Sequence, residues 1–339
     1  MASIRDVAKL AGVSITSVSR VLNNDKNFNI SDETREKIYS AIRELNYKIP
    51  EAYSKSNLVK NSIGCIQRLT IEGAKDNYFS TIVSGIKQHL SKYGKSLQFL
   101  LTQFDFENND YKNIFQTYPK GLILMGDISP EAYAFLKTKI KHIVGIDTSY
   151  DDIDNIRYNR FNAGVDAVEY LIECGHEKIA YIGSNIVPDN LRNIGRFEAY
   201  LRVMRKNNLE VDPSWIIDSK WHRDTCFEET IKLLQQENRP TAIFVGSDHM
   251  AIAAISAINS LGLKVPEDIS VIAISDITES AYLNPPLTTV SIPQKEMGKL
   301  AIETLLQRLN GDTTVNKQIF VPCKLTIRNS VKIIKKELK

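Results

Sequence analysis

The sequence predicts a small all-helical head followed by a larger α/β body with two lobes. The chain has 339 residues, enough for two or three domains at roughly 150 residues per domain. Its composition, with 43% hydrophobic and 24% charged residues, is typical of a globular protein. Two short helical patterns near the start are separated by a glycine, and from residue 62 onward short apolar runs alternate with helical patterns. These observations exclude a single small module and a fibrous or disordered chain.

Charge is distributed unevenly along the chain. Residues 1–60 contain 10 Lys and Arg against 7 Asp and Glu, whereas residues 61–339 contain 33 of each. A basic head on a neutral body favours an anionic partner for the head, such as nucleic acid. No apolar run approaches the ~18 residues of a membrane-spanning helix, and the start lacks a secretion signal. The four cysteines are scattered and form no CxxC pair. From these three observations together we expect a reduced, cytoplasmic protein with no membrane partner.

Glycine and histidine spacing argues against the common enzyme sites. None of the sixteen glycines lies two or four residues from another, which removes the GxGxxG dinucleotide loop and the GxSxG nucleophile elbow. Gly121 and Gly126 have the spacing of a phosphate loop, but Asp127 and Ile128 follow where Lys and Ser or Thr are required. The five histidines show no HExxH motif or metal-ligand spacing. We therefore predict no enzyme activity, no cofactor and no metal site.

The head is predicted to contain three short helices. Gly12 can end the first in the left-handed conformation, Ser14 is placed to cap the second, and Ser31 to cap the third. The expected inner faces are Ile4, Val7, Ala8 and Ala11, then Val18, Val21 and Leu22, then Ile38, Ala41, Ile42 and Leu45. Two helices joined by such a turn form the helix-turn-helix motif, which reads DNA.

A three-helix bundle without a ligand would share this apolar pattern. The outward face of the second predicted helix favours DNA recognition over that alternative. It combines small hydroxyls, which reach phosphates, with an arginine, which can read guanine: Ile15, Thr16, Ser17, Ser19 and Arg20.

A family resemblance rests on these residues. The motif Ile4-Arg5-Asp6-Val7-Ala8, then Ala11-Gly12-Val13-Ser14, Val18-Ser19-Arg20-Val21-Leu22-Asn23, Ile30-Ser31, Thr34-Arg35 and Leu45-Asn46-Tyr47 closely resembles the DNA-binding domain of LacI/GalR-type transcription regulators. The resemblance continues at lower density through the body, in residues 120–124, 175–183, 265–272 and 285–290. It implies a helix-turn-helix head joined to a two-lobed α/β sensor domain like that of periplasmic binding proteins.

For the head, residues 1–48, the resemblance implies specific DNA contacts. Ile15, Thr16 and Arg20 would face base edges in the major groove. Contacts to the DNA backbone would come from Ser3, Ser14, Ser17, Ser19, Asn23, Asn29, Thr34 and Tyr47. The loop 25–29 is longer than in the lactose repressor, so contacts from it, including Asn29, are the least secure.

The segment 49–61 departs from the family pattern. The family's hinge, typically Pro-Asn-x-x-Ala-Arg-x-Leu, folds on the operator and inserts an apolar wedge into the minor groove. Here Ser56 stands at the position of the wedge leucine. Leu58 could serve from a shifted register, but we favour a polar linker in which Lys55 and Lys60 contact phosphates.

The body, residues 62–330, has the βαβα rhythm of parallel sheets covered on both faces. Strands are expected at 63–66, 97–101, 122–125, 143–146, 179–183, 242–246 and 270–274. The lobe nearer the head is expected to comprise 62–158 plus 291–318, and the second lobe 159–290 plus 319–330. Residues 331–339 would form a short tail without the apolar heptads of a tetramerising coil, so we expect a homodimer.

Ligands of such folds bind at the carboxyl ends of strands, between the lobes. Asp147, Ser247, Ser275 and Asp276 follow predicted strands and are candidates, although each taken singly could be a turn or a cap. Asp248 has the position of a helix cap. The acidic group Asp151, Asp152 and Asp154 is interpreted as a solvated loop.

The family resemblance adds further ligand-binding candidates. It implies that Arg196 holds ligand polar groups, with Arg192 as the nearby alternative, and that Trp221 stacks on a sugar ring, unless it is a core tryptophan. Tyr78 and Phe79 would form a wall from the first lobe. Ser247 and Ser275 stand where relatives often have longer Asn or Asp side chains, which leaves the identity of a sugar open.

Together these expectations describe a repressor of carbohydrate-utilisation genes that binds double-stranded operator DNA as a dimer. It would respond to a small sugar, with the galactoside class favoured, and induction is preferred over corepression. The alternative is a corepressor-type regulator that responds to a nucleobase or a sugar phosphate. A sugar-binding transport protein shares the body but lacks such a head. A kinase or dehydrogenase is opposed by the missing glycine loops.

Overall fold

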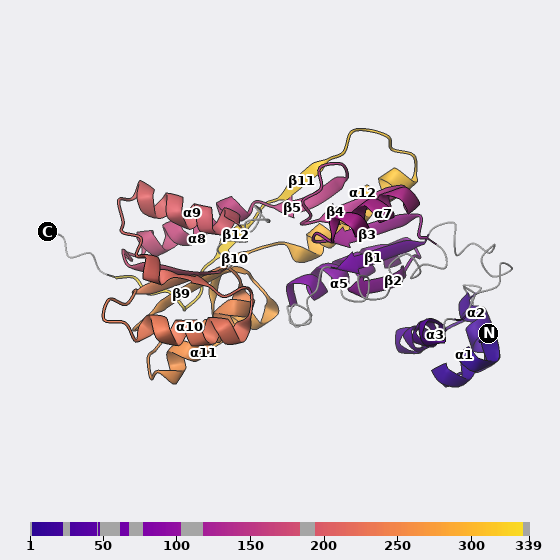
Figure 1. Ribbon diagram of the computed structural model, residues 1–339, viewed down its shortest axis with the longest axis horizontal. Helices are drawn as coiled ribbons and strands as arrows, with labels where there is room; N and C mark the ends of the chain where they lie inside the picture. The colour runs from indigo at the N-terminus through magenta and orange to yellow at the C-terminus, as the bar shows by residue number, and fades with distance from the viewer. Residues whose placement is uncertain are drawn as a thin grey trace.

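The computed structural model describes residues 2–22, 28–45, 47, 62–67, 77–102, 118–183 and 194–334. Figure 1 shows a helical head and two α/β lobes that lie side by side, with the chain passing between the lobes at several points. The segment 49–61, Asn23, Arg192 and residues 335–339 lie outside the described residues. No helix in the described ranges is long and apolar enough to cross a membrane.

The head folds as its apolar spacing predicts. It contains α1 (Ile4–Ala11), α2 (Ile15–Leu22) and α3 (Asp32–Glu44). Gly12 adopts φ 67° and donates its N–H to the carbonyls of Ala8 and Lys9, which confirms the left-handed end of α1. Ten apolar residues form the buried core, namely Val7, Ala8, Ala11, Val18, Val21, Leu22, Ile38, Ala41, Ile42 and Tyr47.

The first lobe contains a parallel sheet with the strand order β11-β5-β4-β3-β1-β2. Its strands are β1 (Ile63–Gln67), β2 (Leu97–Thr102), β3 (Gly121–Met125), β4 (His142–Ile146), β5 (Asp154–Tyr158) and β11 (Gln318–Val321). Its helices are α5 (Asn77–Lys92), α7 (Pro130–Lys139) and α12 (Gln294–Leu309). A Cβ at Gly298 of α12 would lie 2.9 Å from the backbone N of Ile86 in α5, so only glycine permits this close helix contact.

The second lobe repeats the plan with the strand order β12-β10-β9-β8-β6-β7, in which only the β10–β12 pairing is antiparallel among the described strands. Its strands are β6 (Ile179–Gly183), β7 (Ile216–Asp218), β8 (Ala242–Val245), β9 (Ser270–Ser275), β10 (Thr288–Ser291) and β12 (Lys324–Thr326). Its helices are α8 (Arg160–Glu173), α9 (Ile194–Lys206), α10 (Arg223–Leu234) and α11 (Asp248–Ser260), with short turns η3 (Pro213–Trp215) and η4 (Thr278–Tyr282).

Three expected boundaries need correction. All of β11 pairs with β5 of the first sheet, so the chain returns to the second lobe after Val321 and not at 318/319. Ser291 still pairs with Ser275 in the second sheet, so the chain crosses from the second lobe to the first after residue 291 and not before it. The expected tail also begins too early, because Ile334 donates its N–H to the carbonyl of Cys174 at 2.7 Å and so belongs to the second lobe.

The seven expected strands are present, and β5 shows where the interpretation of the acidic group was wrong. Asp151 and Asp152 have side chains 86% and 57% exposed, as expected of a solvated loop. Asp154 instead begins β5 and is only 2% exposed. Its two carboxylate oxygens accept hydrogen bonds from Arg308 Nε at 2.6 Å and Nη2 at 2.8 Å.

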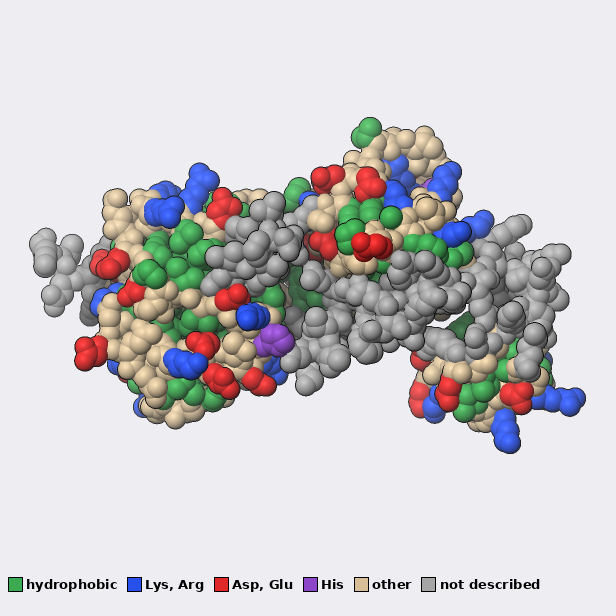
Figure 2. Space-filling model, in the orientation of Figure 1, with side chains coloured by type: hydrophobic (Ala, Val, Ile, Leu, Met, Phe, Trp, Pro, Cys, Tyr) green, Lys and Arg blue, Asp and Glu red, His purple; other side chains and the backbone are tan. Residues whose placement is uncertain are grey.

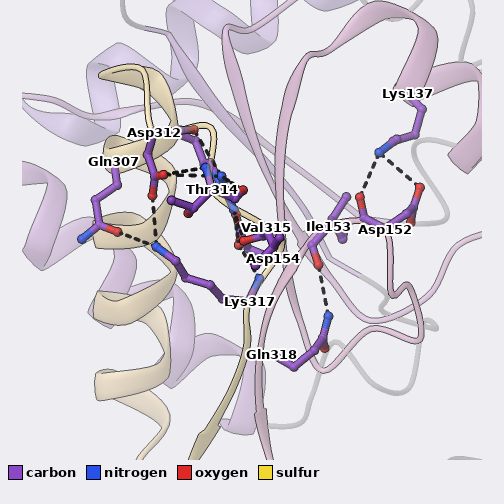
Figure 3. Close-up of polar contacts among 11 residues, drawn as sticks. Lys137, Asp152, Ile153, Asp154, Gln307, Asp312, Thr314, Val315, Lys317 and Gln318 are labelled. Carbon is purple, nitrogen blue, oxygen red and sulfur yellow. Dashed lines mark hydrogen bonds and ion pairs between the residues drawn. The ribbon is translucent and has the colours of Figure 1, made fainter.

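The surroundings of this pair complete its hydrogen bonding, as Figure 3 shows for the segment that follows α12. The backbone N–H of Lys317 donates to Asp154, and the Arg308 guanidinium donates to the carbonyls of Thr314 and Val315. A buried charge is tolerated when it is both paired and hydrogen bonded. This network fixes β11 against β5.

Candidate DNA-binding surface and ligand cleft

The outward face of α2 is held by a cap at its start. The backbone N–H of Ser17 donates to Ser14 Oγ at 3.0 Å, and the two hydroxyls lie 2.8 Å apart. With Val18, Val21 and Leu22 buried, Thr16 and Arg20 are exposed and Ile15 is 44% exposed. The residues expected to face DNA bases therefore share the solvent side of one helix.

The residues predicted to contact the DNA backbone differ in their exposure and in their local hydrogen bonds. Ser3 lies before α1, where its backbone N–H and hydroxyl both donate to Asp6, and these bonds lower the pKa of that carboxyl. Thr34 donates its N–H to the Ser31 hydroxyl, which caps α3 as expected. Asn29 is exposed and Ser19 is half-buried, whereas Tyr47 is buried in the head core.

The first lobe contributes a tyrosine and an aspartate to a cluster of polar and aromatic side chains at the junction of the lobes. Asp147 follows β4 in the left-handed conformation, with φ 54°. The hydroxyl of Tyr78, in the first turn of α5, donates to Asp147 Oδ2 at 2.6 Å. Burial and the neighbouring carboxylate raise the pKa of Tyr78, so its hydroxyl stays protonated. Phe79 packs edge-on against Tyr78, with 5.1 Å between ring centroids.

Arg160 was missed by the sequence analysis. It opens α8, and its Nη2 lies 3.4 Å from Asp147 Oδ1. Burial is the largest single influence and disfavours its charge, but Asp147, Tyr158 and Tyr78 together outweigh burial and raise the pKa of Arg160. Its guanidinium also lies 5.3 Å from the ring centroid of Tyr158. The pair joins the end of β4 in the first lobe to the first helix of the second.

The second lobe contributes Arg196 and Trp221. Arg196 lies in α9, is 8% exposed and donates from Nη2 to the Tyr158 hydroxyl. Its guanidinium carbon lies 5.8 Å from the Tyr158 ring and 5.4 Å from the Trp221 ring, within the range of cation–π contacts. Trp221 follows β7 with φ 60° and is half-buried, so one part of it packs on the lobe while another part is accessible.

Polar atoms without partners gather in this cluster. Nε of Arg196, the hydroxyl of Tyr181 and Oδ1 of Asp147 are buried and have no hydrogen-bond partner among the described residues, although Oδ1 has its longer ionic contact with Arg160. Burying an unsatisfied donor or acceptor costs ~1–3 kcal/mol. A ligand that completes these bonds would recover that cost.

The remaining strand-end candidates are occupied by structural contacts. Ser247 caps α11 by accepting the N–H of Met250, so it and not Asp248 is the helix cap. Asp248 is fully buried and accepts from Ser280, Thr289 and the N–H of Ile277. Burial raises its pKa to about 6 although these hydrogen bonds oppose the shift.

Ser275 and Asp276 also serve the fold. The carbonyl of Ser275 accepts from Gln294 Nε2 at 2.6 Å, and Asp276 pairs with Arg328 at 2.7 Å. The structure thus brings Tyr78, Phe79, Asp147, Arg196 and Trp221 into one cluster with Arg160, Tyr158 and Tyr181. No group of three or more His, Cys, Asp or Glu residues that could hold a metal is found in the part of the chain that the structure describes.

Comparison with known proteins gives two family matches. Residues 3–50 match the model for bacterial regulatory proteins of the lacI family, and residues 168–331 match the periplasmic binding protein-like domain. The first range corresponds to the head, and the second contains most of the second lobe together with α12 and β11 of the first lobe.

Full-length relatives agree with these matches. The chain is 35% identical to the HTH-type transcriptional repressor PurR of Haemophilus influenzae (strain PittEE), covering 98% of this chain and 100% of the relative. It is 32% identical to the ribose operon repressor of Haemophilus influenzae, covering 99% and 100%. The solved lac repressor dimer bound to operator and the anti-inducer ONPF is 26% identical, covers 98% of this chain and 99% of its own, and has a TM-score of 0.67. The chain belongs to the LacI family and is a helix-turn-helix transcription repressor with a periplasmic-binding-protein-like effector domain.

Proposed function

We propose that this repressor binds its operator through the exposed face of α2 and that a small ligand bound around Arg196, Trp221 and Asp147 controls operator affinity. The observation that carries the proposal is the buried, unpartnered Nε of Arg196 between aromatic rings of the two lobes. A ligand that contacts both lobes favours one arrangement of them, and linkage then requires operator and ligand to affect each other's binding equally.

The DNA contacts are proposed for Ile15, Thr16 and Arg20 as base-facing residues, with the surrounding hydroxyls on phosphates. The chain would act as a homodimer on a two-fold operator in the bacterial cytoplasm, supported by the lac repressor dimer on its operator. Arg20→Ala should cost about 2 kcal/mol on the preferred sequence and relax the preference at one base pair. Quantitative binding to duplexes with single base-pair changes tests this.

Ser17→Ala is a matched comparison on the same helix. It removes a hydroxyl that lies beside the cap, and we expect weaker binding to all duplexes in equal proportion, together with a smaller dependence on salt concentration. Equal losses on all sequences for Arg20→Ala as well would contradict base reading by Arg20.

For the ligand, we propose the nucleobase class, acting as a corepressor. A base presents acceptors and donors around a flat ring, which suits Arg196 Nε, Asp147 Oδ1 and the Tyr181 hydroxyl beside the faces of Trp221 and Phe79. The repressors named PurR, similar over nearly the whole chain, support this choice over the galactoside class expected from the sequence.

A sugar is the second candidate, favoured by the accessible part of Trp221 and by the similarity to a ribose operon repressor. The apolar C–H face of a sugar ring stacks on an indole. The two candidates differ in how they contact Arg196. A base is flat and stacks against neighbouring rings, whereas a sugar presents hydroxyls or a phosphate to the arginine.

A thermal-shift screen of bases, nucleosides, sugar phosphates, pentoses and galactosides separates them. A true ligand at about 100 times its Kd stabilises the protein by ~2.7 kcal/mol. We expect stabilisation by a base, lost in Arg196→Gln and kept in Arg205→Gln, an exposed position on the same helix. Stabilisation by a sugar alone would replace the nucleobase proposal, and an equal shift in Arg196→Gln would place the ligand elsewhere.

A further inference from the structure

Phe28 is an aromatic residue of the head that is not among the residues predicted to contact DNA. It lies between α2 and α3. Its ring is half-buried and packs against the head core. The ring also contacts Arg20, whose guanidinium carbon lies 5.4 Å from the ring centroid of Phe28. The loop residue thus reaches back to the arginine at the outer side of α2.

This contact has the geometry of a cation–π interaction, which holds within about 6 Å of a ring centroid. An exposed arginine otherwise samples many rotamers, and fixing it on DNA costs conformational entropy. Stacking occupies the flat face of a guanidinium, whereas the N–H groups that bond a guanine lie in its plane. A ring beneath Arg20 can therefore order the side chain and leave its mode of base recognition intact.

The anchor of the ring is independent of Arg20. Phe28 is packed against the same cluster that contains the buried Val21 and Leu22, the residues of α2 next to Arg20 in sequence. The ring is thereby fixed relative to α2 by apolar contacts, while Arg20 is exposed. A ring anchored in the core gives the Arg20 guanidinium a fixed surface to stack on, which pre-organises the recognition residue.

We propose that Phe28 is a positioning residue for sequence recognition: its ring holds the Arg20 guanidinium and so increases discrimination at the base pair that Arg20 reads. The inference rests on the proposed base-reading role of Arg20. It gives Phe28 a contribution to specificity that does not need Phe28 itself to touch DNA.

The test uses the full-length protein and a duplex selected from random sequences, together with duplexes carrying each single base-pair change. Phe28→Leu keeps an apolar side chain against the core but removes the ring, and Phe28→Tyr keeps the ring. From the strength of exposed cation–π contacts, we expect Phe28→Leu to reduce discrimination about two- to five-fold at the base pair where Arg20→Ala acts, with discrimination elsewhere unchanged. Phe28→Tyr should retain the wild-type ratio.

A double-mutant cycle separates positioning from support of the fold. In the Arg20→Ala background, Phe28→Leu should have no further effect on discrimination. A uniform loss of affinity on every duplex, or the same loss in both backgrounds, would overturn the inference and leave Arg20 as a reader. If Arg20→Ala itself changes no base preference, the proposed role of Arg20 fails first and the inference fails with it.

Discussion

Two Asp–Arg pairs, each with its aspartate in the first lobe, differ in how completely they are hydrogen bonded. Asp154 and Arg308 share two hydrogen bonds of 2.6 and 2.8 Å, and backbone groups occupy the remaining polar atoms (Figure 3). Asp147 and Arg160 approach only to 3.4 Å, and Asp147 Oδ1 has no hydrogen bond among the described residues. The first pair is complete without a ligand, whereas the second leaves an acceptor available between the lobes.

Comparing the two pairs separates a charge that supports the fold from a charge that is placed to bind a ligand. Both aspartates are nearly buried, at 2% and 6% side-chain exposure, so burial does not distinguish them. Completeness of hydrogen bonding does, because a fully satisfied ion pair gains nothing from a ligand. On the face that Figure 2 shows, both lobes carry interspersed acidic and basic side chains.

Removing the arginine of the complete pair should have the largest effect. Arg308→Ala leaves Asp154 buried without its partner, and we expect a loss of about 3 kcal/mol in the free energy of unfolding, measured by urea denaturation. Lys206→Ala, which breaks an exposed pair with Glu169, is the control and should change stability by less than about 0.5 kcal/mol. Similar small losses for both variants would show that the Asp154 network is not structural.

Asp248 extends the comparison to a buried aspartate bonded mainly to hydroxyls. Its pKa is raised from 3.8 to about 6 by burial, so between these values the folded state holds a proton that the unfolded state has released. The associated stability is full below pH 3.8 and is lost as pH rises through 6. Relative to Asp248→Asn, the wild type should therefore lose about 2 kcal/mol of stability between pH 4 and 7.

Denaturation curves of both proteins at several pH values measure that difference. The variant controls for all other titrating groups, since they are common to the two proteins. A constant difference across the range, or one that grows in favour of the wild type at pH 7, would contradict a raised pKa for Asp248.

Replacing the aspartate of the incomplete pair should have the smallest effect on stability. Asp147→Asn keeps the shape and an acceptor for Tyr78 but removes the charge opposite Arg160. We expect a loss of stability below about 1 kcal/mol but at least a tenfold loss of ligand affinity, or about 1.4 kcal/mol, measured by calorimetry with the compound found in the screen. Unchanged ligand affinity would remove Asp147 from the site.

Sequence periodicity predicted the elements whose apolar pattern is local. The helices of the head and the buried strands such as β3 and β8 follow from spacing within a few residues. The strand β5 was missed because its sequence, DNIRY, alternates polar and apolar residues after an acidic loop. Its aspartate is buried by Arg308, which lies 154 residues later in the chain and which no local pattern connects to it.

The cluster around Arg196 shows the same limit. Tyr78, Asp147, Arg196 and Trp221 were expected from strand ends and from the family resemblance, and the structure brings them together. Tyr158 is the last residue of β5 and Arg160 follows shortly after it, and both were missed because β5 was not predicted. Ser275 and Asp276 satisfied the strand-end rule, yet Gln294 and Arg328 from later in the chain engage them.

The most direct test of the central claim measures linkage between the two sites of the full-length protein. Operator Kd is determined with and without the compound from the screen, and the compound's Kd with and without operator. We predict the same factor in both directions, typically 5- to 150-fold, with tighter operator binding when the ligand is present and no coupling in Arg196→Gln. Ligand binding that leaves operator affinity unchanged, or coupling that survives in Arg196→Gln, would contradict control of DNA binding through the cluster around Arg196.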